Sequence, residues 1–529
     1  MQVTVTDGTL FLKAPYDESL INQLNRNGLG MRFDRKTRVW HHPVTHNFAE
    51  SFSRTFPTHT PPEIRSYLTH EPISWVPSSY LMDHQRKGAE LALERPRHGF
   101  FYQTGVGKTN LGLEICVQKR VKTLVVCPLS IITNAWIEDA EKFYPGLKII
   151  NLWAFKKRRK SQSGAIAYRK ALESCSIAVI NFDSFRAIAD ELSKVGFKML
   201  IVDESSKVKE FKSKITKALI KFADDMPYVY LFSGTPAPNS EMEYFSQIRM
   251  LDQELFSTSF YGFRSRYFYP AGYGGYQWKM MEGKRIEFME KLAKVTSVVK
   301  KHDVLDLPEK TINVRDVYLS PKELKAYKEM ERHLIVELED TEVLAANAAV
   351  KLMKLREATS GFLIGEEHKI VVTGHSKLKE LKNLLEEIND QTIIWTNFRH
   401  EAASVTEMLT KAGISWVRAD GTIKQEGKDD AIRKFKSGEA QVFVGHPASV
   451  GHGITLTCCS FMVYFSMSYS YELHQQSMDR IYRYGQKNAC SYYYLIAKDT
   501  VDEVIVKALS KKKKVVDEVF AFIKGRMTE

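Results

Sequence analysis

A chain of 529 residues is too long for one hydrophobic core, and the usual domain size predicts about three domains. With 44% hydrophobic and 26% charged residues the composition is that of a globular protein, and no apolar run approaches the ~20 residues of a membrane span, so we expect no membrane partner. The net charge of +13 fits a polyanionic partner such as nucleic acid.

The amino terminus and the cysteines bear on the compartment. Residues 1–7 lack the basic start and apolar core of a signal peptide, so we expect a cytoplasmic protein. The six cysteines include no C-x-x-C pair, which argues against a zinc site or a disulfide framework and predicts small buried side chains.

Residues 1–65 are predicted to form a small α+β module. Apolar alternation at 3–5 and 10–12 indicates a hairpin, 19–24 a helix, and 31–34 with 38–40 two further strands. Its basic and aromatic residues interleave, namely Arg32, Phe33, Arg35, Lys36, Arg38 and Trp40. Such a set suits phosphate contact with base stacking, but it also suits a small core. We favour the core for Phe33 and Trp40 and leave the arginines open.

A phosphate loop is predicted over residues 101–109, between the turn-like stretch 94–99 and a helical stretch at 110–117. Its backbone N–H groups, at Thr104, Gly105, Val106 and Gly107, would face phosphate oxygens. Lys108 would neutralise phosphate charge and the Thr109 hydroxyl would hold Mg²⁺. Tyr102 stands where the full motif has its first glycine. About twenty residues earlier, Gln85 offers an amide donor and acceptor suited to an adenine edge.

Short apolar runs alternate with helical stretches beyond the loop, at 123–128, 177–182, 199–204 and 228–233. Such runs imply a parallel sheet covered on both faces, whose ligands gather at the carboxyl ends of the strands. Asp203 ends one run and is placed to bind the Mg²⁺ held by Thr109, while Glu204 would orient and deprotonate the attacking water. The next run ends in Ser233-Gly234-Thr235-Pro236, whose hydroxyls would sense the nucleotide.

Residues 250–300 mix aromatic, basic and glycine residues, which fits either a base-stacking surface or a local aromatic core. Three basic runs, at 156–160, 207–221 and 511–514, are candidate phosphate contacts or solvated faces.

A second alternating series follows the helical stretch 321–357, with strands at 392–395, 415–418, 441–444, 461–465 and 491–496. It has no phosphate loop of its own. It carries Gly451-His452-Gly453-Ile454-Thr455 and the stretch 476–486. Arg480 and Arg483 are three apart and would share one face of a helix, as two forked cations suited to a γ-phosphate.

Five segments, in chain order, resemble the motifs of superfamily-two helicase-like ATPases. They are Gln85, Gly105 to Thr109, Asp203 to Ser206, Ser233 to Pro236 and Gln476 to Gln486. The D-R-x-x-R-x-G-Q ending and Lys301 to Pro308 resemble the sucrose-non-fermenting branch, whose members are double-stranded DNA translocases. Ser205-Ser206, Ser449-Val450 and Thr455 depart from the family pattern. The N-terminal residues show a weaker resemblance, to the HepA-related domain of annealing helicases. It is carried by Tyr16-Asp17, 32–34 and 37–40.

The resemblance implies an α/β fold with two RecA-like parallel-sheet lobes in tandem after the α+β module, with boundaries at 1–65, 66–312 and 313–529. It implies that Gln85 meets adenine, Lys108 and Thr109 meet phosphate and Mg²⁺, Asp203 meets Mg²⁺, Glu204 meets water, and Arg480 and Arg483 meet the γ-phosphate. Gly453 and Gln476 would face the nucleotide from the second lobe.

The implied activity is an ATP- and Mg²⁺-dependent translocase on duplex DNA, stimulated by DNA. It would remodel forks and junctions by reversal, branch migration or annealing in replication, recombination or repair. We expect a monomer from a phage or a bacterium. A strand-separating helicase on DNA or RNA, and an ATP-gated DNA clamp with little turnover, are the alternatives.

Overall fold

The computed structural model describes residues 1–509 except 7–8, 27–28, 30, 45, 67–75, 156–160, 272–276, 340–352, 366, 368, 451–453, 469 and 508. The chain forms two compact units: the first includes Met1–Gln103 and Gly107–Lys300, and the second includes Thr104–Val106 and the described residues from Lys301 onward. We call residues 1–66 the N-terminal module, 76–300 lobe 1 and 301–509 lobe 2, and describe each by itself. The basic runs 156–160 and 511–514 lie outside the described residues.

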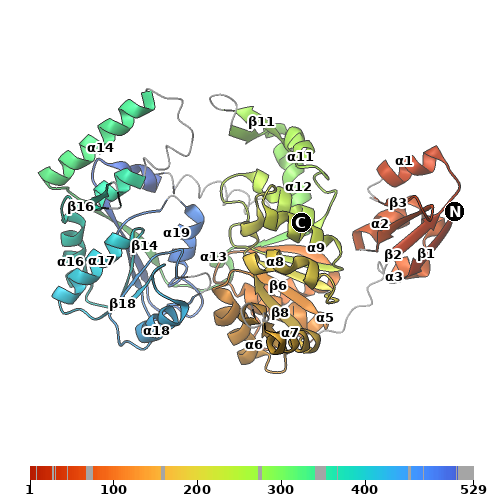
Figure 1. Cartoon of the computed structure of the whole chain (residues 1–529), viewed down its shortest axis with the longest axis horizontal. Helices are drawn as coiled ribbons and strands as arrows, with labels where there is room; N and C mark the ends of the chain where they lie inside the picture. Colours follow the sequence, from red (N-terminus) through yellow and green to blue (C-terminus); the bar gives the residue numbers. More distant parts are fainter. Residues whose placement is uncertain are drawn as a thin grey trace. The chain divides into compact units, whose positions relative to one another are not determined.

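The N-terminal module is a four-stranded antiparallel sheet in the order β1-β2-β4-β3, with helices on one face (Figure 1). Its strands are β1 Gln2–Thr6, β2 Thr9–Lys13, β3 Arg32–Asp34 and β4 Val39–Pro43, and its helices are α1 Glu18–Arg26, α2 His46–Thr55 and α3 Pro62–Ser66. The core includes Leu10, Leu12, Leu24, Phe48 and Phe52.

The two aromatics of the β3–β4 hairpin are not the centre of this core. Trp40 is half-buried and packs against the core, whereas the Phe33 side chain is 46% exposed. The two rings lie 5.1 Å apart between centroids. The expectation of a core role is therefore wrong for Phe33, because leucines and helix α2 already fill the space beneath the sheet.

Lobe 1 is built on a seven-stranded parallel sheet in the order β13-β5-β10-β9-β6-β8-β7. The strands are β5 Arg97–Tyr102, β6 Thr123–Cys127, β7 Ile149–Asn151, β8 Ile177–Asn181, β9 Met199–Asp203, β10 Tyr228–Phe232 and β13 Thr296–Val299. Every residue of β5, β6, β8 and β9 is buried. Because neighbouring strand residues point to opposite faces, both faces are covered.

The covering helices of lobe 1 alternate with these strands (Figure 1). They are α4 Asp83–Glu94, α5 Lys108–Lys119, the π-helical turn η2 Ile132–Ile137, α6 Glu138–Phe143, α7 Gln162–Ser174, α8 Phe182–Leu192, α9 Lys214–Asp224, α10 Tyr244–Leu251 and α12 Arg285–Val295.

One part of the predicted turn before the phosphate loop is instead strand. Arg97, His98 and Gly99 belong to β5 and are buried. The Arg97 guanidinium donates to the carbonyl oxygens of Met250 (2.9 Å), Ala223 (2.9 Å) and Met226 (2.5 Å). These acceptors come from distant helix ends, and they allow a charged side chain to lie inside the lobe.

The aromatic stretch after α10 forms α11 Phe260–Tyr267 and the hairpin β11 Phe268–Ala271 with β12 Gln277–Met280. Phe263, Tyr267 and Phe268 are at most 1% exposed, so they form a local core. Tyr261 and Tyr269 are 56% and 44% exposed. The local-core interpretation is therefore confirmed for the buried residues, while the base-stacking surface stays a prediction.

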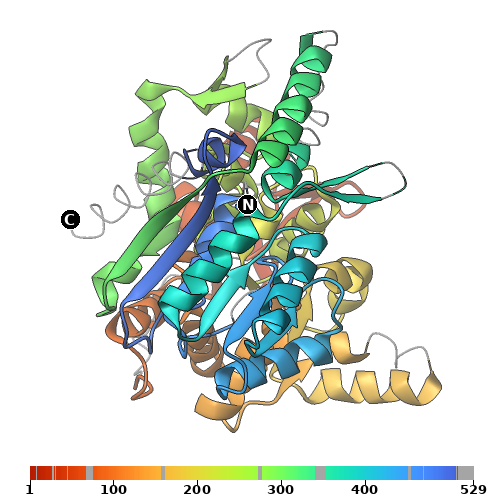
Figure 2. The same ribbon diagram turned by 90° about the vertical axis from the view of Figure 1, so that its left-hand side faces the viewer.

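Lobe 2 contains a six-stranded parallel sheet in the order β14-β21-β20-β17-β19-β18. Its strands are β14 Lys310–Val317, β17 Thr392–Trp395, β18 Trp416–Ala419, β19 Val442–Gly445, β20 Phe461–Tyr464 and β21 Cys490–Ala497. Figure 2 shows the long pair β14 and β21 side by side, and the smaller hairpin of β15 Phe362–Ile364 with β16 Ile370–Val372.

The helices of lobe 2 are α13 Lys301–Val304, α14 Pro321–Glu339, α16 Ser376–Ile388, α17 Arg399–Lys411, α18 Gln425–Lys436 and α19 Tyr471–Met478. The prediction of two parallel-sheet α/β lobes after a small α+β module is confirmed. The exact domain boundaries stay a prediction.

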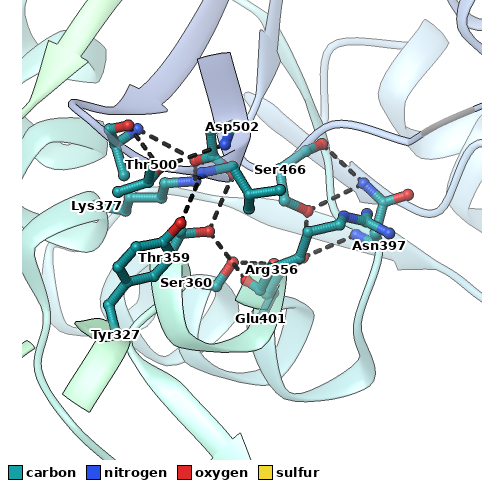
Figure 3. A network of polar contacts seen from close by, with 12 residues as sticks. Tyr327, Arg356, Thr359, Ser360, Lys377, Asn397, Glu401, Ser466, Thr500 and Asp502 are labelled. Atoms are coloured by element: carbon teal, nitrogen blue, oxygen red, sulfur yellow. Dashed lines mark hydrogen bonds and ion pairs between the residues drawn. The ribbon is translucent and has the colours of Figure 1, made fainter. Parts of the chain in front are cut away.

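A buried polar network joins the elements of lobe 2 (Figure 3). Lys377, 2% exposed, forms an ion pair with Asp502, and the distance from its Nζ to Oδ2 is 2.5 Å. Glu401 accepts hydrogen bonds from the hydroxyls of Ser360 (2.6 Å) and Ser466 (2.9 Å). Each buried carboxylate is thus paired or hydrogen-bonded, as burial of a charge requires.

Two further properties concern the described residues as a set. Five cysteines are buried and Cys458 is exposed, so the prediction of burial fails only there. Over the described ranges, no helix combines the length and apolar character needed to cross a bilayer.

Candidate active site

Three adjacent strands of lobe 1 bring the predicted motifs together. In the order β5-β10-β9, the phosphate loop follows β5, Ser233-Gly234-Thr235-Pro236 follows β10, and Asp203 ends β9. The register places Asp203 opposite Phe232, the last residue of β10. Since all three strands are parallel, these segments leave the sheet at the same edge.

The loop itself has the geometry that phosphate binding needs. Gly105 and Gly107 have φ angles of +84° and +77°, in the left-handed region that favours glycine. Gly107 is the N-cap of α5, a helix that runs to Lys119. The loop therefore ends at a helix amino terminus, where backbone N–H groups and the helix dipole favour an anion.

Gln85 supports the loop from α4. Its Nε2 donates to the Gly107 carbonyl at 3.0 Å, and its Oε1 accepts from the Met82 backbone N–H at 2.9 Å. The side chain is 1% exposed. A primary amide can both donate to and accept from an adenine edge. That contact stays a prediction.

Lys108 begins α5 and is buried, with 8% of its surface exposed. Its Nζ donates to the carbonyl oxygens of Tyr102 (3.1 Å) and Gln103 (3.4 Å). Its charge also favours the ionised form of Asp203. The lysine is therefore held between the phosphate loop and the carboxylate at the end of β9.

Asp203 is a buried carboxylate with defined donors. Its Oδ2 accepts from the indole Nε1–H of Trp136 at 3.1 Å, and its Oδ1 accepts from the Glu204 backbone N–H at 3.0 Å. Burial, and next the Glu204 charge, raise the pKa of Asp203 to about 6, while Lys108 and Trp136 act in the opposite direction. Trp136 was not predicted from the sequence. It lies on a π-helical turn, a feature that is frequent at functional sites but is visible only in the structure.

Glu204 has an unusual backbone for a residue with a side chain. Its φ and ψ angles are 55° and 54°, a left-handed conformation that costs a non-glycine residue about 1–2 kcal/mol. The residue is 6% exposed, and Oε2 is buried without a hydrogen-bond partner among the described residues. Strain and an unpaired acceptor of this kind are characteristic of functional sites.

The protein oxygens near Lys108 fit a magnesium ion carried by a nucleotide. Thr109 is half-buried in the first turn of α5, and Asp203 has a carboxylate whose charged form Lys108 favours. Hydroxyl and carboxylate oxygens are the hard ligands that Mg²⁺ prefers, usually with phosphates and water completing the shell.

The second group of predicted residues lies in lobe 2, after β20. Gln476 is on α19, is 5% exposed, and its Oε1 is buried without a hydrogen-bond partner within the described ranges. Arg480 is 4% exposed and its Nη1 donates to the Ile454 carbonyl at 3.4 Å, while Arg483 is half-buried. Gly453 lies outside the described residues.

The helical placement of the two arginines is wrong. Helix α19 ends at Met478, and Arg480 and Arg483 lie in the turns that follow. The Met478 carbonyl accepts from the Tyr482 backbone N–H at 3.4 Å and also from Tyr492 Oη at 2.9 Å, and the Ile481 carbonyl accepts from Gln486 Nε2 at 3.2 Å. Side-chain donors therefore supplement the backbone bonds where the regular helix ends. The meeting of these arginines with a nucleotide stays a prediction.

Lys301 fixes the same turn. It is 5% exposed, forms an ion pair with Asp479, and donates through Nζ to the Tyr482 carbonyl at 2.7 Å. Both contacts flank Arg480. The sequence pointed to Lys301 only as part of a family resemblance. Its role in this turn was not predicted, because its partners lie about 180 residues further along the chain.

Comparison with known families decides the identity. The model of the SNF2-related domain matches residues 69–361, which is more than half of the chain. The chain belongs to the SNF2-related family. The model of the helicase conserved C-terminal domain matches residues 376–485. The resemblance to this branch is confirmed, and the chain is an ATP-hydrolysing enzyme; the HepA-related resemblance of the N-terminal module stays a prediction.

Individual relatives are distant. "Putative protein p41" of Acyrthosiphon pisum secondary endosymbiont phage 1 is 26% identical over 458 residues, which cover 82% of this chain and 96% of that protein. The SWI/SNF-related matrix-associated actin-dependent regulator of chromatin subfamily A-like protein 1 of Xenopus tropicalis is 25% identical over 90% of this chain and 48% of its own length. The chain thus spans about half of that curated relative.

One further protein and one solved structure are also similar to this chain. The DNA repair and recombination protein RDH54 of Saccharomyces cerevisiae is 24% identical over 73% of this chain and 43% of its own length. The Sulfolobus solfataricus SWI2/SNF2 ATPase core, solved in complex with dsDNA, matches 85% of this chain and 94% of that chain with 21% identity and a TM-score of 0.40.

Proposed function

We propose that this SNF2-related ATPase is a double-stranded DNA translocase that remodels branched DNA, by fork reversal, branch migration or annealing. One observation carries the catalytic part: a buried carboxylate pair, Asp203 and Glu204, ends the strand two places from the phosphate loop and shares its surroundings with Lys108. That combination of a cation, an anion-binding loop and an unpaired carboxylate oxygen suits phosphoryl transfer to water.

Each predicted site residue of lobe 1 has its own role in this proposal. The N–H groups from Thr104 to Lys108 hold the β- and γ-phosphates, and the ammonium of Lys108 exchanges its loop carbonyls for phosphate oxygens. Gln85 orients adenine. Glu204 accepts a proton from the attacking water through its unpaired Oε2.

Thr109 and Asp203 would hold Mg²⁺. The ion, when bound, neutralises charge on the transferred phosphate. Asp203 must be ionised to serve as a ligand. The Trp136 indole and Lys108 keep it so near neutral pH against the effect of burial.

In lobe 2, Arg480 and Arg483 would supply positive charge to the γ-phosphate, with Gln476 and Gly453 facing the nucleotide. Cations of this kind contribute about 10³–10⁵-fold to the rate of phosphoryl-transfer enzymes. Lys301 and its ion pair with Asp479 keep the turn that bears both arginines in place.

DNA as the polymer is supported by charge and by the relatives. The chain carries a net charge of +13. The yeast relative is a DNA repair and recombination protein, and the Sulfolobus core was solved with dsDNA. We take duplex DNA as the track, with the chain acting as a monomer.

The N-terminal module supports a preference for branched DNA. Its β3–β4 hairpin exposes Arg35, Lys36 and Arg38 beside the 46% exposed ring of Phe33, which lies against Trp40. Cations contact phosphates, and an exposed aromatic ring stacks on an unpaired base. Forks and junctions offer backbone phosphates and unpaired bases close together.

The catalytic assignment is tested by Glu204→Gln. We expect turnover to fall by roughly 10²–10⁴-fold, the usual contribution of a positioned base, while DNA and ATP binding persist. Glu210→Gln is the matched control, since Glu210 is exposed in the same segment and its carboxylate accepts from the Lys212 backbone N–H at 3.1 Å. Wild-type turnover in the Glu204→Gln protein would overturn the assignment.

The branched-DNA assignment is tested by Phe33→Ala. We expect the extra ATPase stimulation by forked over plain duplex DNA to be lost, with duplex stimulation unchanged. Phe11→Ala is the matched control, because Phe11 is 36% exposed and pairs in register with His41, on the face of the sheet opposite Leu10 and Leu12. An undiminished fork preference in Phe33→Ala would remove the hairpin from DNA recognition.

A further inference from the structure

Helix α10 lies across the two loops that follow β9 and β10. From its first turn, Gln247 reaches both loops and is fully buried. Its Oε1 accepts from the Ser205 hydroxyl at 2.7 Å, and its Nε2 donates to the Pro236 carbonyl at 2.7 Å. One side chain therefore connects the residue after Glu204 to the end of the Ser233–Pro236 loop.

The orientation of this amide is fixed by its partners. Nε2 also donates to the Glu243 carbonyl at 3.1 Å. Carbonyl oxygens only accept, so the nitrogen must face them and the oxygen must face Ser205. The three contacts form one specific arrangement and not a general polar packing.

Neighbouring contacts tie the same helix to the same loops. Glu243, one turn before Gln247, accepts from Asn239 Nδ2 at 2.7 Å and forms an ion pair with Lys209 at 3.4 Å. The Ser246 hydroxyl donates to the Lys209 carbonyl at 3.3 Å. Among these contacts, only that of Gln247 reaches the residue next to Glu204.

The position next to Glu204 matters because Glu204 is in a left-handed conformation. Its backbone is held on one side by the hydrogen bond from its N–H to Asp203 Oδ1. On the other side stands Ser205, whose own side chain is fixed by Gln247. A strained residue persists only where its surroundings determine it, so both supports define where the Glu204 carboxylate points.

We propose that Gln247 is a positioning residue for ATP hydrolysis, which links the Ser233–Pro236 loop to Glu204 through Ser205. The inference rests on the proposed role of Glu204 as the base. A shift of Pro236 moves the Gln247 amide, which moves Ser205 and with it the carboxylate of Glu204. The state of the loop after β10 thereby sets the rate of water attack.

Gln247→Met tests this link. Methionine keeps the length and removes the hydrogen bonds. We expect kcat of the full chain to fall about tenfold or more with KM for ATP within about twofold, because a small misplacement of a catalytic group affects the chemical step. Ser205→Ala, which removes a single hydroxyl, should lower kcat in the same sense and covers the case in which Gln247→Met fails to fold.

The double variant separates positioning from stability. In Gln247→Met the Ser205 hydroxyl is left buried without its acceptor, and adding Ser205→Ala removes that unsatisfied group. Thermal stability should then recover in part while kcat stays low. Recovery of kcat together with stability would show a structural role only and would overturn the proposal, as would wild-type kcat in either single variant.

Two parallel measurements make the result specific. Ser246→Ala removes a buried hydrogen bond from the same helix to the same segment, and should leave kcat unchanged. Glu204→Gln is measured beside it. If Glu204→Gln turns over normally the proposed base fails, whereas an inactive Glu204→Gln with an unaffected Gln247→Met protein overturns only the link described above.

Discussion

Replacing Gly107 with alanine should weaken ATP binding through its contact with Gln85. A Cβ atom at this position would lie 2.1 Å from the Gln85 Nε2, and the residue has a φ angle of +77°. The left-handed backbone costs alanine about 1 kcal/mol, and the hydrogen bond from Gln85 to the Gly107 carbonyl is worth about another 1 kcal/mol.

Further strain comes from moving a side chain that is 1% exposed. The backbone cost falls on the free and the ATP-bound chain alike and lowers the free energy of unfolding. Loss of the Gln85 contact and displacement of its side chain, together about 1–2 kcal/mol, correspond to an ATP affinity lower by about 5–30-fold. Equilibrium titration of the full chain with a fluorescent ATP analogue measures this directly. Gly196→Ala is the control, since Gly196 has a φ of +80° and no atom within 4 Å of the added Cβ.

The control should lose about 1 kcal/mol of unfolding free energy and keep wild-type ATP affinity. Adding Gln85→Ala to Gly107→Ala relieves the clash, so the two effects on affinity should be less than additive. An ATP affinity of the Gly107→Ala protein within about threefold of wild type would refute the reasoning, because the loop would then tolerate the displacement of Gln85.

Three other predictions follow from buried polar groups. Trp136→Phe removes a donor from Asp203, so the pKa of Asp203 should rise above about 6 and the acid limb of the kcat/KM profile should move to higher pH; an unmoved limb would contradict this. Burial lowers the pKa of His98 to about 3, so the unfolded chain binds a proton that the folded chain does not. Stability is then lost as pH falls from 6.5 towards 3, by about 1.4 kcal/mol per unit, and denaturation of His98→Gln should show a shallower slope. Lys377→Met leaves Asp502 charged and buried (Figure 3) and should cost about 3–5 kcal/mol in urea unfolding, against at most about 0.5 kcal/mol for Lys411→Met at an exposed pair; equal losses would refute it.

Buried strands with continuous apolar sequences were predictable, and β6, β9 and β10 lie where the sequence places them. β5 was missed, because Arg97 resembles a turn residue until its carbonyl partners, more than a hundred residues away, are known. The edge strand β14 was missed, since exposed and half-buried residues alternate along most of its length and its charged and polar side chains hide the pattern.

The same distinction applies to the site. Asp203 and Glu204 lie at the end of a strand and Lys108 at the start of the helix after the phosphate loop, so these motif residues could be placed from the sequence. Trp136 and Gln247 could not, because each meets its partner across many residues and neither has a local signal beyond helical apolar spacing. The end of α19 before Arg480 was also hidden, since the side chains that donate to the carbonyls of Met478 and Ile481 lie beyond it in the chain.

The central claim is that this chain is a DNA-driven ATPase that moves along duplex and prefers branches. Steady-state ATP turnover, measured without DNA and with single-stranded, duplex, forked and four-way-junction DNA at fixed salt, tests it most directly, because phosphate contacts make affinity depend steeply on salt. We predict strong stimulation by duplex that increases with its length and is greatest for forks or junctions. Stimulation by single strands alone, or by no DNA, would contradict the account.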